Sequence, residues 1–187
     1  MRTAAAKPHV EAMKLGVAWM PGKAARFVYP SAGNPRVAIL EPGFRETRQV
    51  RFFARMDDEA AIHFAPEALA GTVRQLRGIA TSHQGATVRN AVIVFTREGD
   101  DGLTSYDRDM FWDVFGVPAF EQYLNRRNRL IAGECDAHEG LHIWSSPARR
   151  EGWIRDSSPC ACGDVRPRLM PALELVRAGL TSQGLRP

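Results

Sequence analysis

One segment near the middle of the chain restricts the fold more than any other. Residues 91–95 read Ala-Val-Ile-Val-Phe, an apolar run without a polar or charged residue. A short apolar run that does not alternate with polar residues is typical of a strand buried on both faces, as in a parallel sheet. It is also much shorter than the roughly 20 residues that a membrane helix needs. The run therefore predicts an inner strand of a sheet.

The residues after this run predict a helix and another strand. Thr104 and Asp107 have the spacing of a capping box, and Gly116 is placed to end the helix. The inner face of this helix is expected to consist of Tyr106, Met110, Phe111, Val114 and Phe115. Residues 119–123 then form a strand. Strand, helix and strand at this spacing form a crossover unit, so the predicted class is α/β, with a partial parallel or mixed sheet and flanking helices.

Further elements are predicted upstream. Short apolar segments at residues 37–40 and 50–54 indicate strands, separated by a turn at Pro42 and Gly43. Pro66 suits the first position of a helix. Apolar residues follow it at steps of three and four, at Leu69, Val73, Leu76 and Ala80. A helix starting at Pro66 is therefore expected.

The chain divides into three parts by composition. Residues 1–30 show no sustained hydrophobic period and are expected to form a loosely structured lead-in. Residues 31–125 form the predicted α/β core. Residues 126–187 contain two short strand-like segments, 130–132 and 141–144, but too few apolar residues for a core of their own. This last part needs another source of order.

Overall composition excludes some classes of protein. Hydrophobic residues make up 44% of the chain and charged residues 25%, which are ordinary globular proportions and exclude wholesale disorder. The net charge of +4 is compatible with an anionic partner, including nucleic acid, without requiring one. The N-terminal residues do not form a secretory signal, so we expect a cytoplasmic protein and no membrane partner.

The three cysteines of the chain predict a metal site. Cys135, Cys160 and Cys162 fall in one C-terminal window together with His142. An odd number of cysteines argues against a disulfide framework. Three thiolates and one imidazole complete a tetrahedral zinc shell, which leaves no open position for water. We therefore expect a structural zinc ion and a small zinc-ribbon-like segment.

Two alternatives to this ligand set stay open. His138 lies three residues after Cys135 and competes with His142 as the fourth ligand. The cysteines could also be free thiols, with Cys135 buried as a small hydrophobic residue. A lone histidine in an apolar stretch, such as His142, is more often a core residue than a ligand.

Three motifs follow one another in the second half of the chain. They read FGVPAFEQY at residues 115–123, GECDAHEGLHIW at 133–144 and PCACGDVRPRL at 159–169. Together they resemble the phenylacetate-coenzyme A ligase family of adenylate-forming enzymes, over residues 66–170. The resemblance implies an adenylation-like core and a zinc ion held by Cys135, His142, Cys160 and Cys162.

The catalytic motif of that family is altered in this chain. The family has Tyr-Gly-x-Thr-Glu, whose ring lies against adenine and whose threonine and glutamate serve the phosphate and magnesium. Here Tyr123 is followed by leucine, asparagine, Arg126 and Arg127, which reverses the charge at the magnesium position. The resemblance alone suggests ATP and coenzyme A, whereas this departure argues against both. We expect a truncated, degenerate relative without adenylation activity.

Three functions are compatible with these observations. The expected one is a zinc-stabilised, non-catalytic domain that binds a protein partner or a small ligand, with Tyr123, Arg126 and Arg127 as ligand-binding candidates. The second is a subunit of an acyl-coenzyme A ligase, in which the arginines clamp phosphates and another chain supplies the missing parts. The third is a basic zinc ribbon that binds nucleic acid, with arginines interleaved with Trp144 and Trp153.

Overall fold

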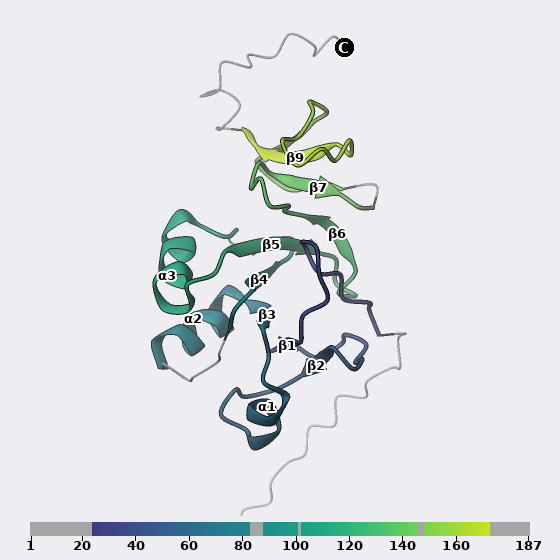
Figure 1. Ribbon diagram of the computed structural model, residues 1–187. Helices are drawn as coiled ribbons and strands as arrows, with labels where there is room; N and C mark the ends of the chain where they lie inside the picture. Colours follow the sequence, from purple (N-terminus) through teal and green to yellow (C-terminus); the bar gives the residue numbers. More distant parts are fainter. Residues whose placement is uncertain (1–23, 83–87, 101, 146–147, 173–187) are drawn as a thin grey trace, which may run out of the picture.

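The computed structural model describes residues 24–82, 88–100, 102–145 and 148–172. Over these ranges the chain forms one nine-stranded sheet with three helices (Figure 1). The elements are β1 (Val37–Ile39), β2 (Val50–Phe52), α1 (Glu59–Phe64), β3 (Ala68–Thr72), α2 (Val73–Ser82), β4 (Ala91–Thr96), α3 (Ser105–Phe115), β5 (Ala119–Leu124), β6 (Leu130–Gly133), β7 (Leu141–Ile143), β8 (Trp153–Asp156) and β9 (Arg168–Pro171).

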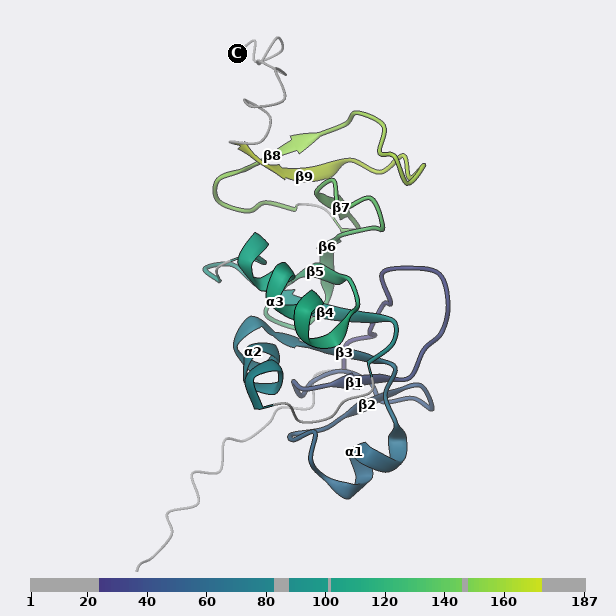
Figure 2. The same ribbon diagram turned by 60° about the vertical axis from the view of Figure 1, so that its left-hand side comes forward.

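The sheet has a parallel half and an antiparallel half. The strand order is β2-β1-β3-β4-β5-β6-β7-β9-β8; the pairs from β2 to β5 are parallel and those from β5 to β8 are antiparallel. In Figures 1 and 2 the antiparallel strands extend the sheet away from the helices. The predicted mixed α/β class is confirmed.

Strand β4 lies in the interior of the parallel half, as its apolar run predicts. All six of its residues are buried, and it pairs with β3 on one side and β5 on the other. Val92 and Val94 pack in one hydrophobic cluster with Phe111 of α3. On the opposite face Phe95 stacks on Phe44, with ring centroids 4.9 Å apart. Both faces of β4 are thus covered.

Helix α3 begins with the predicted capping box. The Thr104 hydroxyl accepts a hydrogen bond from the Asp107 amide at 3.2 Å, and the Asp107 carboxylate accepts one from the Thr104 amide at 3.3 Å. The helix ends at Gly116, whose φ of 65° is in the left-handed region. The predicted start and end of this helix are confirmed.

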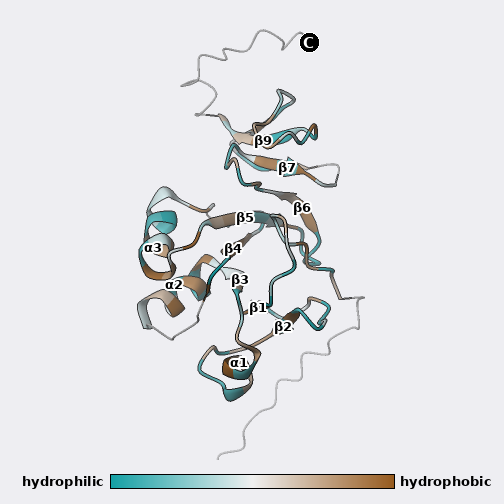
Figure 3. Ribbon diagram, in the orientation of Figure 1, coloured by the Kyte–Doolittle hydropathy of each residue, from teal (hydrophilic) through white to brown (hydrophobic). Residues whose placement is uncertain are grey.

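The predicted inner face of α3 is only partly right. Phe111 is fully buried, and Met110 and Phe115 pack against the same cluster. Tyr106 and Val114, by contrast, are 68% and 40% exposed. The buried face is narrower than expected because the Asp107 carboxylate, paired with an arginine of α2, takes a core-facing position in the first turn. Figure 3 shows hydrophilic and hydrophobic stretches in this helix.

The helix expected to start at Pro66 is wrong in its first part. Residues 68–72 form strand β3, which pairs with β1 and β4, and helix α2 starts at Val73. Leu69 is fully buried inside the sheet rather than on a helix face. In a strand that is covered on both faces, apolar and polar residues do not alternate. Its apolar residues can therefore match the spacing of a helix by coincidence.

Three short elements were missed by the sequence analysis. Helix α1 spans six residues, and strands β8 and β9 span four residues each. Prolines and glycines flank β8 and β9, and neither strand is long enough to show a regular alternation of apolar and polar residues. The two strands are identified in the structure by their antiparallel pairing with each other.

The N-terminal lead-in is described from residue 24 onward. Ala25 is buried and forms a bridge with Phe44, and Phe27 packs against the second face of the sheet. The remainder of the expected lead-in, residues 1–23, lies outside the described residues, and the three-part division of the chain stays a prediction. In the described ranges no helix combines the length and apolar character needed to cross a membrane.

The buried carboxylate of Asp107 generates a pH-dependent prediction. Burial raises its pKa, but hydrogen bonds from Arg77 and Thr104 outweigh burial and hold the pKa below the usual range. Ionised Asp107 therefore stabilises the fold above the pKa of an unfolded aspartate, about 4, and this contribution is lost as the pH falls through the folded-state pKa. We expect Asp107→Asn to lower the free energy of unfolding by about 1 kcal/mol at pH 7.

The measurement is urea denaturation of wild type and variant at pH 7 and near pH 3. The difference between the two proteins should shrink at the lower pH. Asp109→Asn, at an exposed position of the same helix, is the control and should have little effect at either pH. An equal loss for Asp107→Asn at both pH values would contradict the assigned role of its charge.

Candidate metal centre

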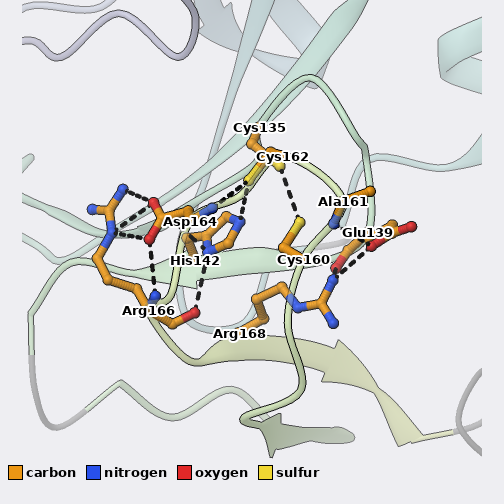
Figure 4. A network of polar contacts seen from close by, with 9 residues as sticks. All are labelled: Cys135, Glu139, His142, Cys160, Ala161, Cys162, Asp164, Arg166 and Arg168. Atoms are coloured by element: carbon orange, nitrogen blue, oxygen red, sulfur yellow. Dashed lines mark hydrogen bonds and ion pairs between the residues drawn. The ribbon is translucent and has the colours of Figure 1, made fainter.

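Four side chains expected to bind a metal converge in the antiparallel half of the structure. The donor atoms of Cys135, His142, Cys160 and Cys162 all lie within 4.8 Å of one another (Figure 4). The Cys135 and Cys160 sulfurs are 3.7 Å apart, and the Cys162 sulfur is 3.3 Å from His142 Nε2. Zinc–sulfur bonds of about 2.3 Å place the sulfurs of a tetrahedral shell about 3.8 Å apart. The donor set and its spacing fit a metal ion.

Strand pairing accounts for the convergence. Cys135 follows β6, His142 lies in β7, and Cys160 and Cys162 lie in the loop between β8 and β9. His142 is opposite Gly133 of β6 and opposite a residue of β9. Because β7 lies between β6 and β9 in the sheet, the two cysteine-bearing loops meet next to His142.

Tight turns present the sulfur atoms. The carbonyl oxygen of Cys135 accepts a hydrogen bond from the His138 amide at 3.0 Å, and that of Cys160 accepts one from the Gly163 amide at 2.9 Å. Gly163 has a φ of 81°, which glycine adopts without strain. The following amide, that of Asp164, donates to the Cys162 sulfur at 3.4 Å. An amide donor thus faces a sulfur and favours its ionised form.

His142 has the orientation of a metal-binding histidine. It is buried, and its Nδ1 lies 3.3 Å from the carbonyl oxygen of Arg166. With Nδ1–H donating to that carbonyl, Nε2 carries the lone pair and faces the sulfurs. A hydrogen bond from the second ring nitrogen commonly sets the tautomer of a metal-binding histidine.

His138 lies outside the cluster. Its ring stacks on Phe120 with centroids 4.9 Å apart, and its Nδ1 is 3.7 Å from a carboxylate oxygen of Glu134. The four-residue group of potential metal donors contains His142 and not His138. Of the two candidate histidines, the structure therefore brings only His142 to the thiols.

The thiols differ in their readiness to ionise. Burial raises the pKa of Cys135 to about 12, whereas the amide of Asp164 lowers the pKa of Cys162. An ion that binds all three sulfurs must displace the proton of Cys135. The hydrogen bonds from Arg166 lower the pKa of Asp164 to about 2 and keep this residue negatively charged near His142.

Arg168 connects the two loops that carry the cysteines. Its buried guanidinium donates to the carbonyl oxygen and the carboxylate of Glu139, each at 2.9 Å. It also donates to the Asp156 carboxylate at 2.7 Å and to the Ser158 hydroxyl at 3.0 Å. One side chain thus links the loop after β6 with the loop after β8.

The ligand-binding candidates lie elsewhere. Tyr123, Arg126 and Arg127 line a cavity of about 760 Å³ at the carboxyl ends of β4 and β5. The Tyr123 ring is buried: its hydroxyl donates to the carbonyl oxygen of Arg149 at 3.2 Å, and the guanidinium of Arg150 lies 5.3 Å from its centroid. Arg150 therefore covers the ring that the family resemblance places against adenine.

A buried ion pair beside this cavity was missed by the sequence analysis. Glu121 of β5 accepts hydrogen bonds from Arg150 at 2.6 Å and from the Thr96 hydroxyl at 2.7 Å, and both charged side chains are buried. Arg150 also lies 4.3 Å from the ring centroid of Trp153. Glu121 sits within a strand-like sequence, and no local pattern connects it with an arginine 29 residues away.

For this chain, comparisons with known proteins gave structural similarity but no match to a family model or to a curated protein. Among solved structures it is similar to an open conformation of 2-hydroxyisobutyryl-CoA ligase in complex with 2-HIB-AMP and CoA, with 14% sequence identity and a TM-score of 0.44. The match covers 58% of this chain and 35% of that chain. A likeness at this level does not establish a shared activity.

The buried pair of Glu121 and Arg150 leads to a prediction about stability. Glu121→Gln leaves the guanidinium of Arg150 buried without its counter-charge. We expect the free energy of unfolding to fall by about 3 kcal/mol, because removing one partner of a buried pair leaves an uncompensated charge. Arg150→Met should cost a similar amount.

The double variant Glu121→Gln with Arg150→Met completes a double-mutant cycle. It should lose less stability than the sum of the two single variants, because the two side chains interact directly. Chemical denaturation of all four proteins supplies the measurement. Additive losses would show that the pair is not coupled.

Proposed function

We propose that this chain is a zinc-stabilised, ligase-like domain that does not activate carboxylic acids and acts by binding a small ligand or a protein partner. The proposal depends chiefly on the convergence of Cys135, His142, Cys160 and Cys162. Three sulfurs and one imidazole favour zinc over magnesium or calcium, which prefer oxygen ligands. Four protein ligands fill a tetrahedral shell, so the ion's role is to hold the fold.

The sparse apolar packing around the cluster supports a structural role for the ion. The hydrophobic cluster of the antiparallel half has only four buried members among the described residues, Tyr123, Ala132, Leu141 and Leu169. In the β8–β9 loop, residues 157–167, only Cys160 is buried, and the other residues are exposed or half-buried. A metal that binds only the folded chain adds its binding free energy to folding.

The absence of adenylation chemistry is proposed from the residues after β5. We infer a distant relationship to the phenylacetate-coenzyme A ligase family from the three sequence motifs. In that family a threonine and a glutamate follow the tyrosine, and here Arg126 and Arg127 occupy their places. Guanidinium groups repel Mg²⁺, so the metal-dependent activation step lacks the glutamate that serves magnesium in that family.

A second candidate is a subunit of an acyl-coenzyme A ligase. The cavity at the carboxyl ends of β4 and β5 favours it, because ligands of open α/β sheets commonly bind at that edge. A nucleic-acid-binding ribbon has weaker support. Trp144 and Trp153, the rings expected to stack on bases, each have an arginine within 4.3 Å of the ring centroid, Arg166 and Arg150 respectively.

Metal analysis tests the zinc proposal. Protein purified without added zinc should contain one zinc ion per chain, and a Cys160→Ser/Cys162→Ser variant should contain none and melt at a lower temperature. His138→Ala should retain the ion, since His138 stacks on Phe120 outside the cluster. Wild-type protein without metal, or loss of metal from His138→Ala, would refute the proposed ligand set. In the cobalt-substituted protein, sulfur-to-metal charge-transfer bands should report thiolate ligation.

An exchange assay tests the proposed lack of adenylation. We expect no carboxylic-acid-dependent exchange of pyrophosphate into ATP above the level of the Cys160→Ser/Cys162→Ser variant. Exchange by the wild-type chain alone would overturn this part of the proposal. Exchange that arises only after a second chain is added would instead support the ligase-subunit candidate.

A further inference from the structure

The cavity next to β5 has a lining rich in arginine. Its volume of about 760 Å³ lies within the range of small-molecule sites, roughly 300–1,000 Å³. The arginines that line it come from the β4–α3 loop, the β5–β6 turn and the segment after β7: Arg97, Arg126, Arg127, Arg129 and Arg149. Because three separate segments contribute, the charges converge on a hollow instead of following one exposed loop.

Four of these guanidinium groups form no ion pair within the described part of the chain. Arg97 forms an ion pair with Glu41, but none of the other four arginines of the lining forms an ion pair with a described residue. Two exposed carboxylates, those of Glu98 and Asp100, also line the cavity. Asp100 is partly engaged, since its carboxylate accepts the Arg97 amide at 2.9 Å. Positive charge therefore remains in excess.

The turn that carries three of the arginines is held in place by asparagines. The Asn125 side chain accepts hydrogen bonds from the amides of Arg127 at 2.8 Å and Arg129 at 3.1 Å. The Asn128 side chain donates to the carbonyl oxygen of Pro42 at 3.0 Å and accepts from Arg97 at 2.6 Å. A turn ordered in this way presents its arginines with a reduced entropic cost of binding.

The shape of the site favours a compact anion. A nucleic-acid strand is bound along a groove with open aromatic rings for its bases, whereas the Tyr123 ring at this cavity is buried under Arg150. Planar guanidinium forks donate paired hydrogen bonds to phosphate oxygens. An excess of positive charge in a hollow also removes the need for a divalent cation to neutralise the ligand.

We propose that this cavity binds a small phosphate-bearing molecule directly on Arg126, Arg127, Arg129 and Arg149, without a divalent cation. This inference rests on the proposed function, because it specifies the chemical class of the small ligand. It differs from metal-dependent nucleotide activation, in which carboxylates hold the magnesium that accompanies the phosphates.

Isothermal titration calorimetry with inorganic pyrophosphate, at low ionic strength and without added magnesium, tests the proposal. Wild type should bind, and Arg126→Ala/Arg127→Ala should bind at least tenfold more weakly, because each charge-assisted hydrogen bond contributes about 1.5–3 kcal/mol. The matched control, Arg74→Ala/Arg155→Ala, removes the same charge at exposed positions outside the cavity and should bind like wild type. Equal weakening in both double variants would overturn the proposal.

Titrations with other ligands show which chemical class of anion the cavity prefers. ADP binding more tightly than pyrophosphate, with the same dependence on Arg126 and Arg127, would support the proposal and identify a nucleotide. Citrate binding as tightly as pyrophosphate would overturn the assignment to phosphate. A single-stranded oligonucleotide binding more tightly than either phosphate compound would overturn the small-ligand proposal in favour of nucleic acid.

Metal content separates this inference from the proposed function. Arg126→Ala/Arg127→Ala should retain the wild-type zinc content and melting temperature, because both side chains are exposed and lie outside the metal cluster. If zinc is present but pyrophosphate does not bind, only the inference about the cavity fails. If zinc is absent from wild type, the proposed function fails whatever the cavity binds.

Discussion

The rest of the structure depends on the backbone pairing of strand β5 with β4 on one side and β6 on the other, two strands that run in opposite directions to each other. β5 is parallel to β4 and antiparallel to β6, so it joins the helix-covered half of the sheet to the antiparallel half. All six of its residues are buried. The candidate metal centre is built on the antiparallel side of this strand, and the arginine-lined cavity lies at its carboxyl end. Both candidate sites therefore depend on its register.

The two halves of the sheet are stabilised by different interactions. Around β4, apolar side chains cover both faces, and burial of this surface supplies the driving force. In the antiparallel half the apolar cluster is small, and polar contacts connect the segments. Half-buried Arg108 of α3 pairs with buried Glu134 at 2.6 Å, and buried Arg168 reaches Glu139 and Ser158 in the two cysteine-bearing loops. Ion pairs of this kind are weak evidence for stability, because the cost of desolvating the charges offsets their attraction. A bound metal ion would add its binding free energy to the stability of this half.

Much of the parallel half could be predicted from local sequence. The apolar run of β4 and the capping box of α3 act through neighbouring residues, so a short window contains the whole signal. The start of α2 could not be predicted in this way, because the buried residues of β3 match helical spacing. Strands β8 and β9 were missed for another reason, since four-residue strands become stable only through pairing.

The sequence by itself determined the α/β class and the four residue types needed for a tetrahedral metal shell, because both depend on composition and spacing along the chain. Only the tertiary structure decided that His142, and not His138, lies beside the thiols, since the pairing of β7 with β6 and β9 sets that position. It also placed Arg150 over Tyr123 and brought Arg149 into the lining of the same cavity as Arg126. Contacts between residues far apart in the chain follow from strand order and register, which no short segment of sequence encodes.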